Sequence, residues 1–132
     1  MSENFEIILN YIKDLSVETP DAETIIYVKD NISKYQMNID ITSNPLKNKM
    51  IEVNTILKFE DKNDSKHKSY FEMSYATILK IDDEINEKKE LEKIILCDVQ
   101  SKITPNLEKS FLDMLHNSGY PNMKFEKKLD FE

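Results

Sequence analysis

The regular alternation of apolar and polar residues constrains the fold of this chain more than any other feature. Apolar side chains fall on every second position through residues 34–42, and largely so through 51–59 and 70–81. Successive side chains of a β-strand point to opposite faces of a sheet, so this period predicts half-buried strands. A fourth alternating run near the N-terminus places four apolar residues on one face: Phe5, Ile7, Leu9 and Tyr11.

Short polar connections between these runs predict four antiparallel strands. The apolar spacing then changes to that of a helix over residues 82–102, and a loop is expected near Thr104 and Pro105. A second helix is expected to begin there, with Thr104 as its N-cap, Pro105 in its first turn and Gly119 at its C-terminal end. The predicted fold is therefore α+β, a four-stranded antiparallel sheet with two helices packed on one face, in one domain over residues 1–132.

The opposite face of this sheet is not purely polar, because Tyr70, Ala76 and Ile78 fall on it. Partly apolar surfaces often form subunit contacts, so we expect the protein to oligomerise.

Composition excludes several classes of function. The 18 basic residues are outnumbered by 25 acidic ones, giving a net charge of −7, so nucleic acid is not expected as a partner. Gly119 is the only glycine, which argues against a glycine-rich phosphate-binding loop. The single cysteine, Cys97, forms no internal disulfide and fits a reducing compartment. Without a long apolar run or a basic N-terminal start, no membrane insertion is expected, and the predicted location is the cytoplasm.

Residues 11–20, with the sequence YIKDLSVETP, carry a resemblance to a known family. This run is similar to the aromatic-x-Lys-Asp-apolar-Ser-apolar-Glu-x-Pro opening of the SecB family of bacterial export chaperones. Further matches in order are Lys29-Asp30, Glu52-Val53, Ser118-Gly119-Tyr120-Pro121 and Leu129-Asp130-Phe131. The chain departs from the family at Asn31, where a tryptophan is common, and it stops at Glu132, where family members continue into a last helix and an acidic tail.

The resemblance implies a homotetramer, a dimer of dimers, that holds unfolded precursor proteins and passes them to the SecA ATPase. It implies no cofactor and no catalysed reaction. A client-binding groove is implied at four positions that match the family: Tyr35, Met37, Ile39 and Phe71. Contact with SecA is implied at the matching carboxylates and their apolar neighbour: Asp14, Glu18, Glu72 and Tyr70.

Alternatives remain at this stage. Alternation reports burial, so the groove residues also fit ordinary core packing, and the carboxylates also fit a solvated surface. The chain could be a SecB-like chaperone dedicated to one partner, such as an antitoxin, or an adaptor without a groove. A small enzyme using Glu18 with Glu72 is a further alternative. His67 and His116 lack ligand spacing for a metal, and Cys97 lacks a histidine partner.

Overall fold

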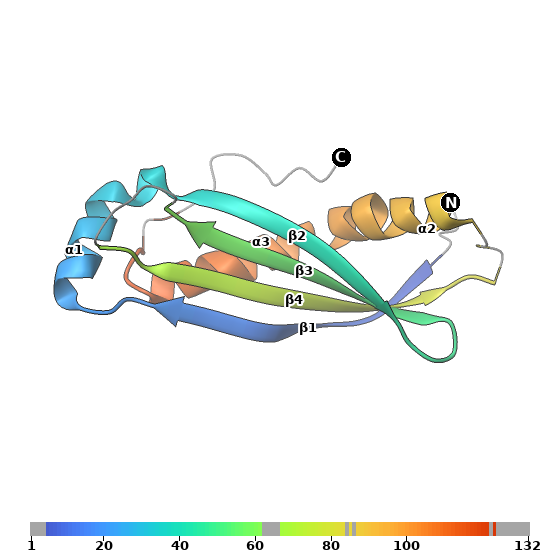
Figure 1. The fold of residues 1–132 in the computed structure, drawn as a ribbon. Helices are drawn as coiled ribbons and strands as arrows, with labels where there is room; N and C mark the ends of the chain where they lie inside the picture. Colours follow the sequence, from blue (N-terminus) through green and yellow to red (C-terminus); the bar gives the residue numbers. More distant parts are fainter. Residues whose placement is uncertain (1–4, 62–66, 84, 86, 122, 124–132) are drawn as a thin grey trace.

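A long four-stranded antiparallel sheet dominates the computed structural model, which describes residues 5–61, 67–83, 85, 87–121 and 123 (Figure 1). The spatial order is β1-β4-β3-β2, so β1 and β2 form the two edges of the sheet. The predicted sheet is confirmed. The strands are β1 (Phe5–Glu18), β2 (Gln36–Pro45), β3 (Met50–Glu60) and β4 (Tyr70–Ile81).

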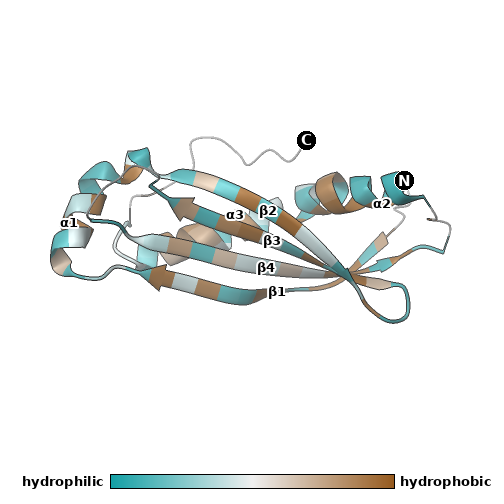
Figure 2. Cartoon of the chain, viewed as in Figure 1, coloured by the Kyte–Doolittle hydropathy of each residue, from teal (hydrophilic) through white to brown (hydrophobic). Residues whose placement is uncertain are grey.

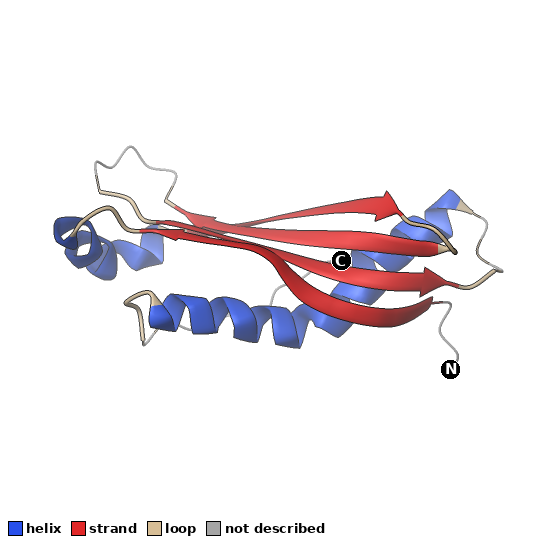
Figure 3. Cartoon of the chain, turned by 90° about the horizontal axis from the view of Figure 1, so that it is seen from below, coloured by secondary structure: helices blue, strands red, loops and turns tan. Residues whose placement is uncertain are grey.

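One face of the sheet is covered by a long helical segment, as Figure 3 shows from below. This segment consists of α2 (Lys88–Lys93), the π-helical turn η2 (Ile94–Asp98) and α3 (Val99–Asn117). We call this side of the sheet the covered face and the opposite side the open face. The predicted α+β class, a four-stranded sheet with helices, is thereby confirmed.

The loop and helix start expected at Thr104 and Pro105 are wrong, because α3 runs through both residues. Pro105 is exposed, and the Thr104 hydroxyl donates a hydrogen bond to the Gln100 carbonyl one turn earlier. A proline inside a helix costs about 3 kcal/mol. Ile103 and Leu107 are both buried on the sheet side, and burying two such side chains is worth about as much or more. Packing against the sheet therefore keeps this segment helical.

The expected end of α3 at Gly119 is confirmed. Gly119 has a φ of +111°, and the Tyr120 N–H donates to the Leu115 carbonyl at 3.1 Å, which closes the helix with a Schellman-type turn. A Cβ atom at Gly119 would also lie 2.5 Å from Cδ1 of Ile25, so the close packing of this turn requires glycine.

A helix in the connection between β1 and β2 was not expected from the sequence. This helix, α1 (Ala22–Asn31), continues into the 3₁₀ turn η1 (Ile32–Lys34) and lies at one end of the sheet (Figure 1). Asp21 caps it by accepting a hydrogen bond from the Thr24 N–H at 2.7 Å. Val28 is fully buried, so α1 contributes to the core from the end of the sheet.

The main core lies between the covered face and α3. Along β3 and β4 the buried positions alternate with less buried ones, and Figure 2 shows the matching bands of hydropathy. The largest fully buried side chains include Leu57, Phe71, Met73 and Leu79 of the sheet with Ile103, Leu107, Phe111 and Leu115 of α3.

Candidate functional site

Two irregularities in β1 decide which of its side chains reach the open face. Ile7 and Leu9 pair with the successive residues Leu79 and Ile78 of β4, so Ile8 is an extra residue in the ladder. In the same way Ile12 and Asp14 pair with Tyr75 and Ser74, so Lys13 is an extra residue. Each extra residue inverts the alternation of the side chains that follow it.

The prediction that Phe5, Ile7, Leu9 and Tyr11 share one face is therefore wrong. Phe5 and Ile7 pack against the core, whereas Leu9 is 47% exposed and pairs with Ile78. Tyr11 lies opposite Ala76 on the open face. The extra residue Ile8 interrupts the alternation that the sequence pattern extends through this segment.

The second irregularity brings the predicted SecA-facing residues together on the open face. Glu18 pairs with Tyr70, and Asp14 pairs with Ser74, two residues along β4 from Glu72. Asp14 and Glu18 are exposed, and Tyr70 and Glu72 are half-buried. We call this group, Asp14, Glu18, Tyr70 and Glu72, the acidic corner.

Neighbouring charges on β3 complete the electrostatics of the acidic corner. Lys58 Nζ lies 3.5 Å from the Glu72 carboxylate. Burial first, and then the nearby carboxylates of Glu72, Glu60 and Asp14, raise the pKa of Tyr70. Glu60 was not identified from the sequence, although it has the same strand phase as Glu52 and Lys58. The corner thus offers carboxylates beside an aromatic ring, which suits a cationic peptide with apolar side chains.

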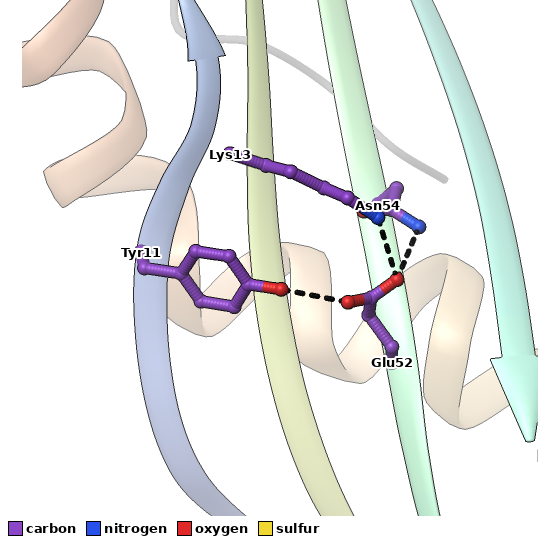
Figure 4. Close-up of polar contacts among 4 residues, drawn as sticks. All are labelled: Tyr11, Lys13, Glu52 and Asn54. Carbon is purple, nitrogen blue, oxygen red and sulfur yellow. Dashed lines mark hydrogen bonds and ion pairs between the residues drawn. The ribbon is translucent and has the colours of Figure 1, made fainter. Parts of the chain in front are cut away.

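A cluster of four polar residues holds β1 to β3 across the intervening strand β4 (Figure 4). The Tyr11 hydroxyl donates to Glu52 Oε2 at 2.7 Å, and Lys13 Nζ donates to Glu52 Oε1 at 2.9 Å. Asn54 Nδ2 donates to the same Oε1 at 3.1 Å. We call these residues, Tyr11, Lys13, Glu52 and Asn54, the clamp.

Hydrogen bonding inside the clamp favours the ionised form of Glu52. The bonds from Tyr11, Lys13 and Asn54, in that order, lower the pKa of Glu52 from 4.5 to about 2. The hydrogen bond to Glu52 raises the pKa of Lys13 and that of Tyr11. Asn54 is only 5% exposed, and its Oδ1 has no hydrogen-bond partner within the described part of the chain. The sequence pattern did not identify the clamp as a unit.

The four predicted groove residues divide into two pairs. Tyr35 and Phe71 are 7% and 0% exposed and pack together, with ring centroids 6.1 Å apart. Burial raises the pKa of the Tyr35 hydroxyl, which donates to the Ser69 carbonyl. Met37 and Ile39, on the edge strand β2, are only half-buried against the core. Of the four predicted residues, Met37 and Ile39 are therefore the two that are more accessible to solvent in the single subunit.

The edge strand β1 presents a row of exposed apolar side chains, of which the sequence pattern placed only Leu9, on the buried face. An edge strand also leaves one row of backbone N–H and C=O groups without a strand partner. The large side chains exposed along β1 are Ile8 (46%), Leu9 (47%), Ile12 (46%), Leu15 (48%) and Val17 (38%).

The remaining candidate residues occupy ordinary structural positions. His67 lies beside α1, with its ring 5.7 Å from that of Tyr27, and His116 hydrogen-bonds to the Met123 carbonyl. Cys97 is half-buried in η2. Over the described residues, no three His, Cys, Asp or Glu side chains are grouped to hold a metal ion. The helices of that same part are all too short or too polar to cross a membrane.

Comparison with known proteins gives consistent results. The family model described as preprotein translocase subunit SecB matches residues 1–132. A Pelagibacter ubique protein assigned as a protein-export protein SecB is 57% identical over 131 residues, covering 99% of this chain and 94% of that relative. The protein-export protein SecB of Rhodospirillum rubrum is 26% identical over 92% of this chain and 73% of its own length.

Among solved structures, the fold matches a SecB-like chaperone of Mycobacterium tuberculosis in complex with a peptide from the HigA1 antitoxin. The TM-score is 0.65 at 10% identity, with 94% of this chain and 90% of that chain covered. This likeness shows a shared fold. The Leu129-Asp130-Phe131 match quoted from the sequence lies outside the described residues.

Proposed function

Because the chain belongs to the SecB family of protein-export chaperones, we propose that it keeps secretory precursors unfolded and delivers them to the SecA ATPase. One observation carries the delivery step: the strand register gathers Asp14, Glu18, Tyr70 and Glu72 on the open face. Carboxylates on a solvent-facing sheet raise the local negative potential, which steers a cationic segment of SecA and fixes its register. The proposed partner-binding site is the acidic corner.

We propose that precursor binding uses an apolar groove along β2, with Met37 and Ile39 at its surface. Tyr35 and Phe71 would support this groove from the core, since both are buried and pack against each other. Methionine and aromatic side chains adapt to many client sequences. Covering several hundred Å² of apolar client surface contributes on the order of 10 kcal/mol, most of which is offset by association and ordering costs.

Weak individual sites favour an assembly in which several grooves bind one precursor. We propose a homotetramer, a dimer of dimers, in which β1 of one subunit pairs with β1 of another. The exposed apolar residues and unpaired backbone of this edge strand support such pairing. Residues 1–132 would act as one chaperone domain in the cytoplasm, without a cofactor and without catalysing a reaction. Linked grooves gain affinity by avidity.

Charge reversal in the acidic corner tests the delivery step. The variant Asp14→Lys/Glu72→Lys should bind SecA about tenfold more weakly, because two attractive contacts become repulsive. It should still delay the refolding of an unfolded precursor without ATP, because the groove is unchanged. The matched control is Glu92→Lys/Asp113→Lys, which makes the same charge change at exposed positions of the long helix. Equal SecA affinity for the corner variant and its parent would remove the acidic corner from the proposal.

A chaperone dedicated to one partner is the alternative function. The M. tuberculosis protein with this fold was solved with an antitoxin peptide, which makes one small protein the expected partner in that case. Identification of the polypeptides that co-purify with the chain separates the two functions. Many unrelated precursors support the export role, whereas a single small partner supports the dedicated role.

A further inference from the structure

The clamp contains the residue that determines which face the side chains in the second half of β1 occupy. Lys13 is the extra residue of the second irregularity, and Tyr11 stands two residues before it. Both side chains reach across β4 to Glu52 of β3 (Figure 4). Ala76 lies between Tyr11 and Asn54 in the register and is fully buried, because its small side chain lets the clamp cross β4 above it.

The extra residue decides which face receives the acidic corner. With Lys13 outside the ladder, Leu15 and Val17 pair with Met73 and Phe71 on the covered face. Asp14 and Glu18 consequently fall on the open face with Glu72. If Lys13 entered the ladder, the alternation would invert, and both carboxylates would turn toward the covered face.

Apolar burial is a weak restraint on this choice. Leu15 and Val17 remain 48% and 38% exposed on the covered side of the edge strand. The clamp is a more specific restraint, because Glu52 is only 14% exposed and accepts both β1 donors. An ionised acceptor makes these hydrogen bonds stronger than neutral ones.

We propose that Tyr11, Lys13 and Glu52 are positioning residues that hold the Lys13 irregularity and keep Asp14 and Glu18 on the open face. The role assigned to that face rests on the proposed function. The face on which the β1 side chains lie does not depend on the proposed function, so it can be measured without any partner.

The first experiment follows the phase of β1 in the full chain by methyl NMR. In the parent, the methyl groups of Leu15 and Met73 should give a strong nuclear Overhauser contact. The variant Lys13→Met/Glu52→Leu removes the clamp without changing the net charge. It should weaken that contact and speed amide exchange over residues 13–18 by about tenfold or more.

Two further variants make this result decisive. Lys49→Met/Asp83→Leu removes a separate, exposed ion pair, whose atoms are 2.5 Å apart, and should leave the Leu15–Met73 contact unchanged. Tyr11→Phe removes one clamp bond only and serves if the double variant does not fold; it should give a smaller change in the same direction. An unaltered Leu15–Met73 contact and unaltered exchange in the clamp variants would overturn the proposal.

The second experiment connects the clamp to binding through a double-mutant cycle with purified SecA. Asp14→Asn should weaken binding about fivefold in the parent and less than about twofold in the Lys13→Met/Glu52→Leu background. A fivefold weakening in both backgrounds would overturn the positioning role. If Asp14→Asn has no effect in the parent while the Leu15–Met73 contact is lost in the clamp variant, the clamp is supported and the SecA proposal fails.

Discussion

The two faces of the sheet are built in different ways. On the covered face, Leu57, Phe71 and Met73 are fully buried, and many interchangeable apolar contacts hold them. On the open face, half-buried and exposed side chains dominate, and a few directional hydrogen bonds organise them. The covered face therefore supplies most of the stability, whereas the geometry of the open face depends on single polar residues.

Each face also contains one exception: a buried polar residue on the covered face and a buried small apolar residue on the open face. On the covered face, Gln100 of α3 is fully buried; it accepts from the Thr55 hydroxyl at 3.0 Å and donates to the Ile95 carbonyl. On the open face, Ala76 is fully buried beneath the clamp. A buried polar group is tolerated where its bonds are satisfied, and a small apolar group is buried where polar side chains must cross it.

The largest expected effect is on the covered face. Phe111→Ala should lower the free energy of unfolding by about 3–5 kcal/mol, because it removes a fully buried ring that meets Phe59 edge to face at 6.2 Å. Urea unfolding at fixed protein concentration measures this change. Asp113→Ala, an exposed position on the same helix, is the control and should change little. A loss below about 1 kcal/mol at Phe111 would contradict the assignment of stability to this face.

The second-largest expected loss of stability is at Gln100, the buried polar residue on the covered face. Gln100→Leu leaves the Thr55 hydroxyl and the Ile95 carbonyl without their partner and should cost about 2–3 kcal/mol. Adding Thr55→Val should recover part of the loss, because it removes one of the orphaned groups. Thermal and urea unfolding of the single and double variants measure both effects. Equal losses in the two variants would show that the Thr55 bond contributes nothing.

Acid should weaken the clamp on the open face. Hydrogen bonds lower the pKa of Glu52 to about 2, below its ordinary 4.5, so its stabilisation is complete above the ordinary value and is lost as the pH falls toward 2. Glu52→Gln should cost about 1–2 kcal/mol near neutral pH. The difference between parent and variant should close between these two pKa values. A difference independent of pH would show that ionised Glu52 is not responsible.

The smallest expected effect is at the exposed edge of the acidic corner. Lys58 Nζ is 3.5 Å from Glu72, and its side chain is 47% exposed, so Lys58→Met should change the free energy of unfolding by less than about 0.5 kcal/mol. The same change should strengthen SecA binding at low salt, because it leaves the corner more negative. Binding titrations at two salt concentrations test this. Weaker binding that is insensitive to salt would contradict it.

Much of the covered face could be predicted from the sequence. The alternation of β2, β3 and β4 has the phase that the pattern predicts, and Leu107, Phe111 and Leu115 of α3 are buried as their helical spacing indicates. The α1 helix was missed because its apolar residues form one short continuous run, residues 25–28, and the periodicity of so short a run does not separate a helix from a strand. Asp21, three residues before Thr24, was the local signal that could have revealed it.

By itself, the sequence determined the family, the α+β class and the apolar faces of three strands, because these depend on local periodicity and on the order of motifs. Only the tertiary structure decided the phase of β1 and the continuity of α3 through Pro105. The partners of Tyr11 and Lys13 are 41 and 39 residues away in the chain, so no local pattern records that the ladder skips Lys13. Likewise, the cost of a proline in a helix is local, whereas the burial that offsets it comes from sheet strands that are distant in the sequence.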